Sequence, residues 1–186
     1  IVYLSTAFLA FALTSKLVAI LDKRKLLLLC VFGVAIASPF AFITFNLGLT
    51  PDKGTTQLVL FLCIPLIFIS TFSIMGNMTR DSMIGDIADE VELQSGKRQE
   101  GVLYSALSFV AKVNTAIGTI TGGLVLSYLN YSTDNPTYEQ TYSLFFVQGV
   151  AGPTLLIIPI FIFYFYDLDR KKHSEILIKI KERSIP

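Results

Sequence analysis

Residues 54–79 of the chain read GTTQLVLFLCIPLIFISTFSIMGNMT, a run without a charged side chain. Two further runs, 26–51 and 140–166, are equally free of charge. A helix needs about 20 mostly apolar residues to cross the hydrocarbon layer of a membrane. A helix in water would need a polar face instead, and runs of this length leave none. The sequence therefore predicts helices that span a membrane.

Five such helices are expected along the chain. Apolar character also continues from residue 1 past Lys16 to residue 21, and the run 101–133 is interrupted only by Lys112. The predicted fold class is thus an all-α membrane protein with five transmembrane helices. Their expected bounds are 2–21, 26–46, 56–78, 102–129 and 141–166.

The composition excludes several other classes of protein. Only 16% of the residues are charged and the formal net charge is +1, so the basic face of a nucleic-acid binder is missing. Two cysteines cannot make a disulfide scaffold, and one histidine cannot build a site of several imidazoles. We find no nucleophile–base pair, metal motif or phosphate-binding glycine loop. We therefore expect neither an enzyme nor a resident cofactor.

The distribution of Lys and Arg predicts the orientation, because cytoplasmic loops are enriched in these residues. The turn 22–25, the segment 80–100 and the tail 167–186 hold 12 of the 15 cations and are predicted to be cytoplasmic. The loops 47–57 and 131–139 hold one and are predicted to lie outside. We expect a multi-pass protein of the plasma (inner) membrane with a cytoplasmic C-terminus.

The cytoplasmic segment 80–100 is rich in acidic residues. Asp81 is expected to cap a short amphipathic helix, which Gly96 ends because glycine suits the position after a helix. The carboxylates would offer oxygen ligands to a hard cation, but their spacing is not that of an EF-hand. We expect a solvated face or ion pairs within the segment instead. The acidic residues are Asp86, Asp89, Glu90 and Glu92, and the basic ones are Arg80, Lys97 and Arg98.

The span 102–129 carries a stripe of polar side chains. At 100° per residue, five of them fall within about 80° of one another; they are Tyr104, Ser108, Lys112, Thr115 and Thr119. Lys112 lies about 18 Å along the helix from Glu100, too deep for easy escape to the headgroups. Its ammonium needs water, an anion or a carboxylate there. We predict that the stripe faces the bundle interior or a water-filled path; the alternative is a structural ion pair or a snorkelled lysine.

Two observations suggest a piece of a larger protein. No acidic residue lies in any of the five expected spans, so a carboxylate partner for Lys112 would come from outside this chain. The chain also opens with Ile1, which is predicted to lie outside, and shows no signal peptide. We therefore expect the C-terminal part of a larger membrane protein.

Two prolines and the tail are the remaining local features. Pro39 and Pro65 lie inside expected spans, where proline permits a hinge or a packing bend. The tail has three apolar residues on one side among cations, as in an amphipathic helix at an anionic membrane surface. His173, in the same tail, is expected to be an exposed surface residue. The three apolar residues are Ile176, Leu177 and Ile180.

Two motifs resemble those of a known family. The first reads Asp86-Ile-Ala-Asp89-Glu-x-Glu92-Leu-x-Ser-Gly96-Lys-Arg98-x-Glu100-Gly101, followed by Tyr104-Ser105 and Lys112. The second, in the tail, reads Tyr166-Asp-Leu-Asp169, then His173, Ile176 and Arg183. Both resemble the glycoside–pentoside–hexuronide:cation symporters of the major facilitator superfamily. The likeness covers nearly all of the chain and is most specific over 81–118.

The resemblance implies a twelve-helix carrier in two halves, of which these spans are helices eight to twelve. It implies sugar symport with Na⁺ or H⁺ by alternating access, with the stripe on the substrate and cation pathway and Lys112 near the sugar and coupling ion. The expected partners are the sugar, the cation, the lipid bilayer and the missing N-terminal half. It also implies a cytoplasmic gate; its candidates are Asp86, Asp89, Glu92, Arg98 and Glu100. A carrier of a non-sugar solute and a non-transporting membrane scaffold stay open as alternatives.

Overall fold

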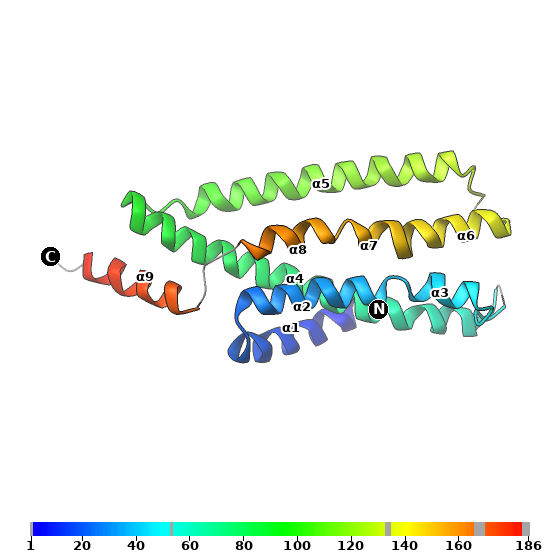
Figure 1. Ribbon diagram of the computed structural model, residues 1–186, viewed down its shortest axis with the longest axis horizontal. Coiled ribbons are helices and arrows are strands. Elements are labelled where there is room, and N and C mark those ends of the chain that lie inside the picture. The colour runs from blue at the N-terminus through cyan, green and yellow to red at the C-terminus, as the bar shows by residue number, and fades with distance from the viewer. Residues whose placement is uncertain (1, 53, 133–134, 166–169, 184–186) are drawn as a thin grey trace. The chain divides into compact units, whose positions relative to one another are not determined.

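The computed structural model describes residues 2–52, 54–132, 135–165 and 170–183 (Figure 1). Within these ranges the regular elements are all helices, as the sequence predicted. The end of the last expected span and part of the tail motif, residues 166–169, lie outside the described residues. The helices are α1 (Val2–Ile20), α2 (Lys23–Ala37), α3 (Phe40–Asn46), α4 (Thr56–Ser95), α5 (Glu100–Tyr128), α6 (Tyr138–Phe146), the π-helix η1 (Val147–Ala151), α7 (Gly152–Thr154), α8 (Ile157–Tyr164) and α9 (Arg170–Arg183).

Among the described residues, four helical stretches are long and apolar enough to cross a membrane. They are Lys23–Asn46, Thr56–Ser95, Glu100–Tyr128 and Tyr138–Phe163. The expected span 2–21 corresponds to α1, whose apolar part Leu4–Ile20 is shorter than these four. The structure thus agrees with an all-helical membrane protein, and it supports four of the five expected spans by length.

The expected boundary within α4 is wrong. A separate helix starting at Asp81 was predicted, but α4 runs without a break from Thr56 to Ser95, with Pro65 inside it. Asp81 therefore cannot cap a helix, because an N-cap residue needs a non-helical backbone. The predicted end is confirmed: Gly96 has a φ of +71° and donates its N–H to the Glu92 carbonyl oxygen at 2.9 Å.

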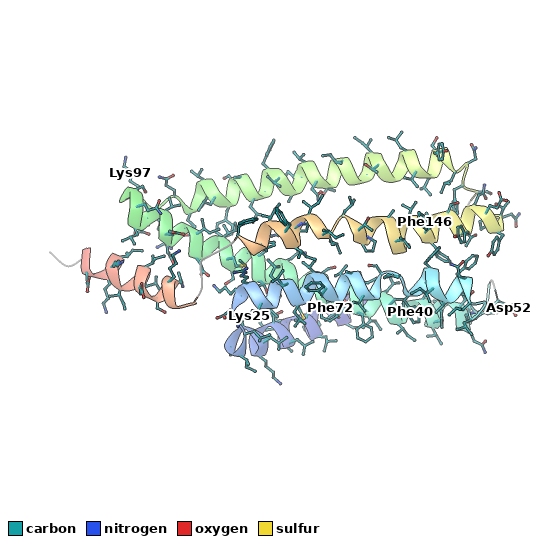
Figure 2. The ribbon with its side chains drawn as sticks, in the orientation of Figure 1. Lys25, Phe40, Asp52, Phe72, Lys97 and Phe146 are labelled. Atoms are coloured by element: carbon teal, nitrogen blue, oxygen red, sulfur yellow. The ribbon has the colours of Figure 1, made fainter. Side chains whose placement is uncertain are left out.

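Two compact units make up the chain, and the first consists of Ile1–Arg80 with Thr141–Asp167. Figure 1 shows α1 and α2 side by side in it, and the two helices are in contact. Phe72 of α4, labelled in Figure 2, packs directly on Gly33 of α2. A Cβ atom at position 33 would lie 2.6 Å from the Phe72 ring, so this approach requires glycine. The buried core of the unit consists of Ala10, Leu26, Cys30 and Met75.

Two interrupted helices meet in this first unit. At Pro39, where a hinge or a packing bend was expected, the regular helix is interrupted over two residues: α2 ends at Ala37 and α3 begins at Phe40, although Ser38 and Pro39 keep helical backbone angles. The last expected span is likewise divided into α6, η1, α7 and α8. Gly149 of the π-helix is buried against the Pro39 break: a Cβ there would lie 3.0 Å from the Cβ of Phe42 and 3.3 Å from the Cα of Pro39. The two irregular backbones therefore touch through a residue without a side chain.

The second unit consists of Asp81–Gln140 with Leu168–Pro186 and includes the end of α4 together with α5 and α9. Its buried apolar side chains, among the described residues, are Met83, Ala88 and Ile176. No residue of α5 is buried. The core of this unit is therefore small and lies along the last turns of α4.

Candidate functional site

The polar stripe lies on one face of α5, as predicted, because the helix is uninterrupted from Glu100 to Tyr128. Five large apolar side chains of α5 fall on the opposite side, at about 140–220° when Tyr104 is taken as zero, whereas Leu126, at about 40°, lies among the polar ones. These five residues are Phe109, Val113, Ile117, Ile120 and Leu124, and they are between 40% and 68% exposed. α5 thus has an apolar face suited to lipid and a polar face suited to a wet interior.

The hydroxyl groups of the stripe differ in what they contact. Thr115 Oγ1 donates to the Ala111 carbonyl oxygen and Thr119 Oγ1 to the Thr115 carbonyl oxygen, both at 2.9 Å. Each threonine oxygen still has acceptor capacity for a polar solute. Tyr104 Oη donates to the carbonyl oxygen of Asp81 at 3.1 Å and so links α5 to α4. This hydrogen bond therefore fixes the position of the Tyr104 side chain relative to α4.

Lys112 is the one cation of the stripe, and it is exposed. Within the described part of the chain, no side chain forms a hydrogen bond or an ion pair with its ammonium. An ammonium at this depth in a bilayer is costly unless water or a counter-charge reaches it. The counter-charge expected for Lys112 is thus not found among the described residues.

The acidic end of α4 contacts the tail, and the prediction for His173 is wrong. Its Nε2 lies 3.0 Å from Asp89 Oδ2 and 3.5 Å from Asp86 Oδ1. The side chains of His173 and Asp89 are 23% and 24% exposed, and that of Asp86 only 12%. The ring is half-buried between α9 and α4, so it is not an exposed surface residue.

The helical spacing of residues in the tail is consistent with this contact of His173. At 100° per residue, His173, Ile176 and Ile180 lie within about 60° of one another on α9. Ile176 is buried in the second unit, whereas Leu177 is 46% exposed. Ile176, on the apolar side of the tail, is thus covered by protein, and the histidine that shares this side is covered with it.

The remaining gate candidates form a second pair in the connection between α4 and α5. Arg98 donates a hydrogen bond through Nε to Glu100 Oε2 at 3.0 Å, and its Nη2 forms a salt bridge with the same oxygen at 3.0 Å. The hydrogen bond and charge of Glu100 raise the pKa of Arg98, and the charges of Glu92 and Asp89 add to this effect. The five predicted residues therefore do not form one cluster: two lie on His173, and Arg98 and Glu100 pair with each other under the influence of Glu92.

A groove of about 460 Å³ lies in the first unit between α2 and α4. Its walls include Phe32, Ile36, Phe40, Pro65 and Phe68, all apolar. A polyol needs convergent hydrogen-bond donors and acceptors, so this groove does not suit a sugar. Among the described residues, no group of three or more His, Cys, Asp or Glu side chains could hold a metal ion.

Comparison with known proteins gives one family match and several relatives. A family described as "MFS/sugar transport protein" matches residues 1–170. The chain is 25% identical over 103 residues to the "Uncharacterized symporter YnaJ" of Bacillus subtilis, covering 55% of this chain and 22% of that protein. It is 38% identical over 53 residues to the "Putative glycoside/cation symporter YagG" of Escherichia coli, covering 28% and 12%.

A third relative is the "Uncharacterized symporter sll1374" of Synechocystis, 28% identical over 109 residues, covering 55% of this chain and 20% of that protein. The chain thus spans about a fifth or less of the length of the curated relatives it matches. No solved structure matches the chain.

Proposed function

Because the chain belongs to the MFS/sugar transport protein family, among the glycoside–pentoside–hexuronide:cation symporters, we propose that it is part of a cation-coupled sugar transporter that works by alternating access. Such a carrier binds solute and coupling ion, Na⁺ or H⁺, between two halves that rock around the site. Binding stabilises one arrangement of the halves over the other. A relative named as a glycoside/cation symporter supports the sugar as substrate.

The observation that carries this proposal is the polar face of α5. Lys112 stands on it without a partner among the described residues, flanked by the hydroxyls of Ser108, Thr115 and Thr119. A sugar offers hydroxyls that donate to and accept from such groups. A site for the coupling cation would contain carboxylates, and carboxylates near the stripe would also balance the charge of the ammonium.

The architecture that goes with this function has five spans in this chain, with α1 counted as the first. They form part of the C-terminal half of a twelve-helix carrier in the plasma (inner) membrane, with the C-terminus in the cytoplasm. The positive-inside distribution of Lys and Arg supports this orientation. The ion pair of Arg98 with Glu100 would then lie at the cytoplasmic gate, together with Asp86 and Asp89, and would change as the gate opens.

The test is uptake of radiolabelled glycosides, pentosides and hexuronides into proteoliposomes under a sodium or a proton gradient, with the full-length protein. Lys112→Leu is expected to abolish cation-driven uptake while reconstitution stays normal, and Lys112→Arg is expected to retain part of it. The matched control is Lys97→Leu, an exposed lysine after the end of α4 (Figure 2) that should transport normally. Unchanged gradient-driven uptake in Lys112→Leu would contradict the role of the lysine. Uptake of non-sugar solutes alone would replace the sugar as substrate.

A further inference from the structure

The C-terminal helix α9 is held on α4 by a contact between residues that are far apart in the sequence. His173 follows Asp89 by 84 positions, yet their side chains are 3.0 Å apart. Asp86, one turn before Asp89 on α4, approaches the same ring nitrogen at 3.5 Å. A single imidazole thus bridges two carboxylates on one face of α4.

The charge of this contact depends on one proton. The charged groups that the structure places against the His173 ring are the carboxylates of Asp86 and Asp89, both on α4; along α9 itself the nearest charged residues are Lys172 and Glu175. A protonated imidazole is attracted to both carboxylates, whereas a neutral one only donates or accepts a single hydrogen bond at Nε2. Histidine is the side chain whose charge ordinarily changes between pH 5 and 8.

The apolar part of the contact is small. Ile176 is buried, with 6% of its surface exposed, but Leu177 and Ile178 are 46% and 58% exposed. One isoleucine contributes most of the apolar burial of this helix, so its attachment is weak enough for a charged contact to change the balance.

We propose that His173, Asp86 and Asp89 form a proton-sensitive latch that holds α9 on α4. The helix is docked when the imidazole carries a proton and is released more often when the imidazole is neutral. The latch shares Asp86 and Asp89 with the proposed cytoplasmic gate, but it needs neither a sugar nor a coupling cation, so it can be tested without transport.

The test measures how often position 176 is uncovered. In a cysteine-free form of the full-length protein in nanodiscs, with every native cysteine replaced by alanine, Cys30 and Cys63 among them, a single cysteine is introduced by Ile176→Cys or by Ile178→Cys. The second variant is the matched control, because residue 178 is exposed on the same helix. The ratio of their maleimide labelling rates cancels the pH dependence of the thiol. We expect this ratio to rise about fivefold from pH 6 to pH 8, the factor for one partly exposed charge pair, and to become constant in a His173→Gln background.

A second measurement avoids the cysteine at a buried position. Hydrogen exchange of the α9 amides, corrected for the intrinsic effect of pH, should be slower at pH 6 than at pH 8 in the unmodified protein. The variant with Asp86→Asn and Asp89→Asn should lose the difference, whereas Glu182→Gln, at an exposed position of α9, should keep it. Equal protection at both pH values in the unmodified protein would overturn the latch, as would a pH dependence that persists in His173→Gln.

Discussion

Replacing Gly33 by alanine is expected to destabilise the contact between α2 and α4. The new Cβ would lie 2.6 Å from the Phe72 ring, and ordinary contact begins near 3.4 Å, so ring or helix must move by about 0.8 Å. Overpacking of this kind costs about 1–3 kcal/mol. Alanine returns up to about 1 kcal/mol through its better helix propensity. The middle of that cost, about 2 kcal/mol, less this gain leaves a net loss of about 1 kcal/mol.

Thermal unfolding of the full-length protein in detergent measures this loss, and the midpoint should fall by about 2–4 °C. Gly101→Ala is the matched control, since nothing lies within 4 Å of a Cβ at that position of α5. Combining Gly33→Ala with Phe72→Leu should recover part of the stability, with a coupling of at least about 1 kcal/mol. A midpoint for Gly33→Ala equal to or above that of the unmodified protein would show that the two helices do not pack as described.

Two further substitutions test contacts in the two units. Gly149→Val should lower the unfolding midpoint more than Gly101→Val does. The atoms that face Gly149 include the backbone of Pro39, which has less freedom to move than a side chain. Equal effects of the two substitutions would refute the close approach of Gly149 to the interruption at Pro39. Tyr104→Phe removes the hydrogen bond to the Asp81 carbonyl oxygen and should destabilise the second unit by about 0.5–1.5 kcal/mol. The loss should appear as faster hydrogen exchange of the amides of residues 81–85. Unchanged exchange there would contradict this contact.

Much of the helical architecture could be predicted from the sequence, because it follows from local properties. Uncharged runs of sufficient length indicated helices, Pro39 indicated a possible hinge or bend in one of them, and Gly96 indicated an end. The error at Asp81 is also local in origin. An aspartate before an amphipathic pattern looks like a cap, but no proline lies between Pro65 and Asp81, and the helix continues through Asp81.

The contacts between helices could not be predicted in the same way. Nothing in the spacing of Asp86, Asp89 and His173 brings them together, because the chain between them includes α5 and the whole of the last span. The close approaches at Gly33 and Gly149 depend on which helices become neighbours, and a glycine in an apolar run carries no sign of its partner. The stripe on α5 was predictable because it needs only the period of a single helix.

The π-helical turn Val147–Ala151 changes the meaning of an alignment across the last span. Such a turn contains one residue more than an α-turn, so everything that follows it is rotated by about 100° around the helix axis. A homologous sequence lacking that extra residue would direct the aromatic residues of Ile157–Tyr164 toward different neighbours while matching them letter for letter. A one-residue gap in an alignment at this place would therefore mean that the helix after it is rotated about its axis, and not merely that one side chain is missing.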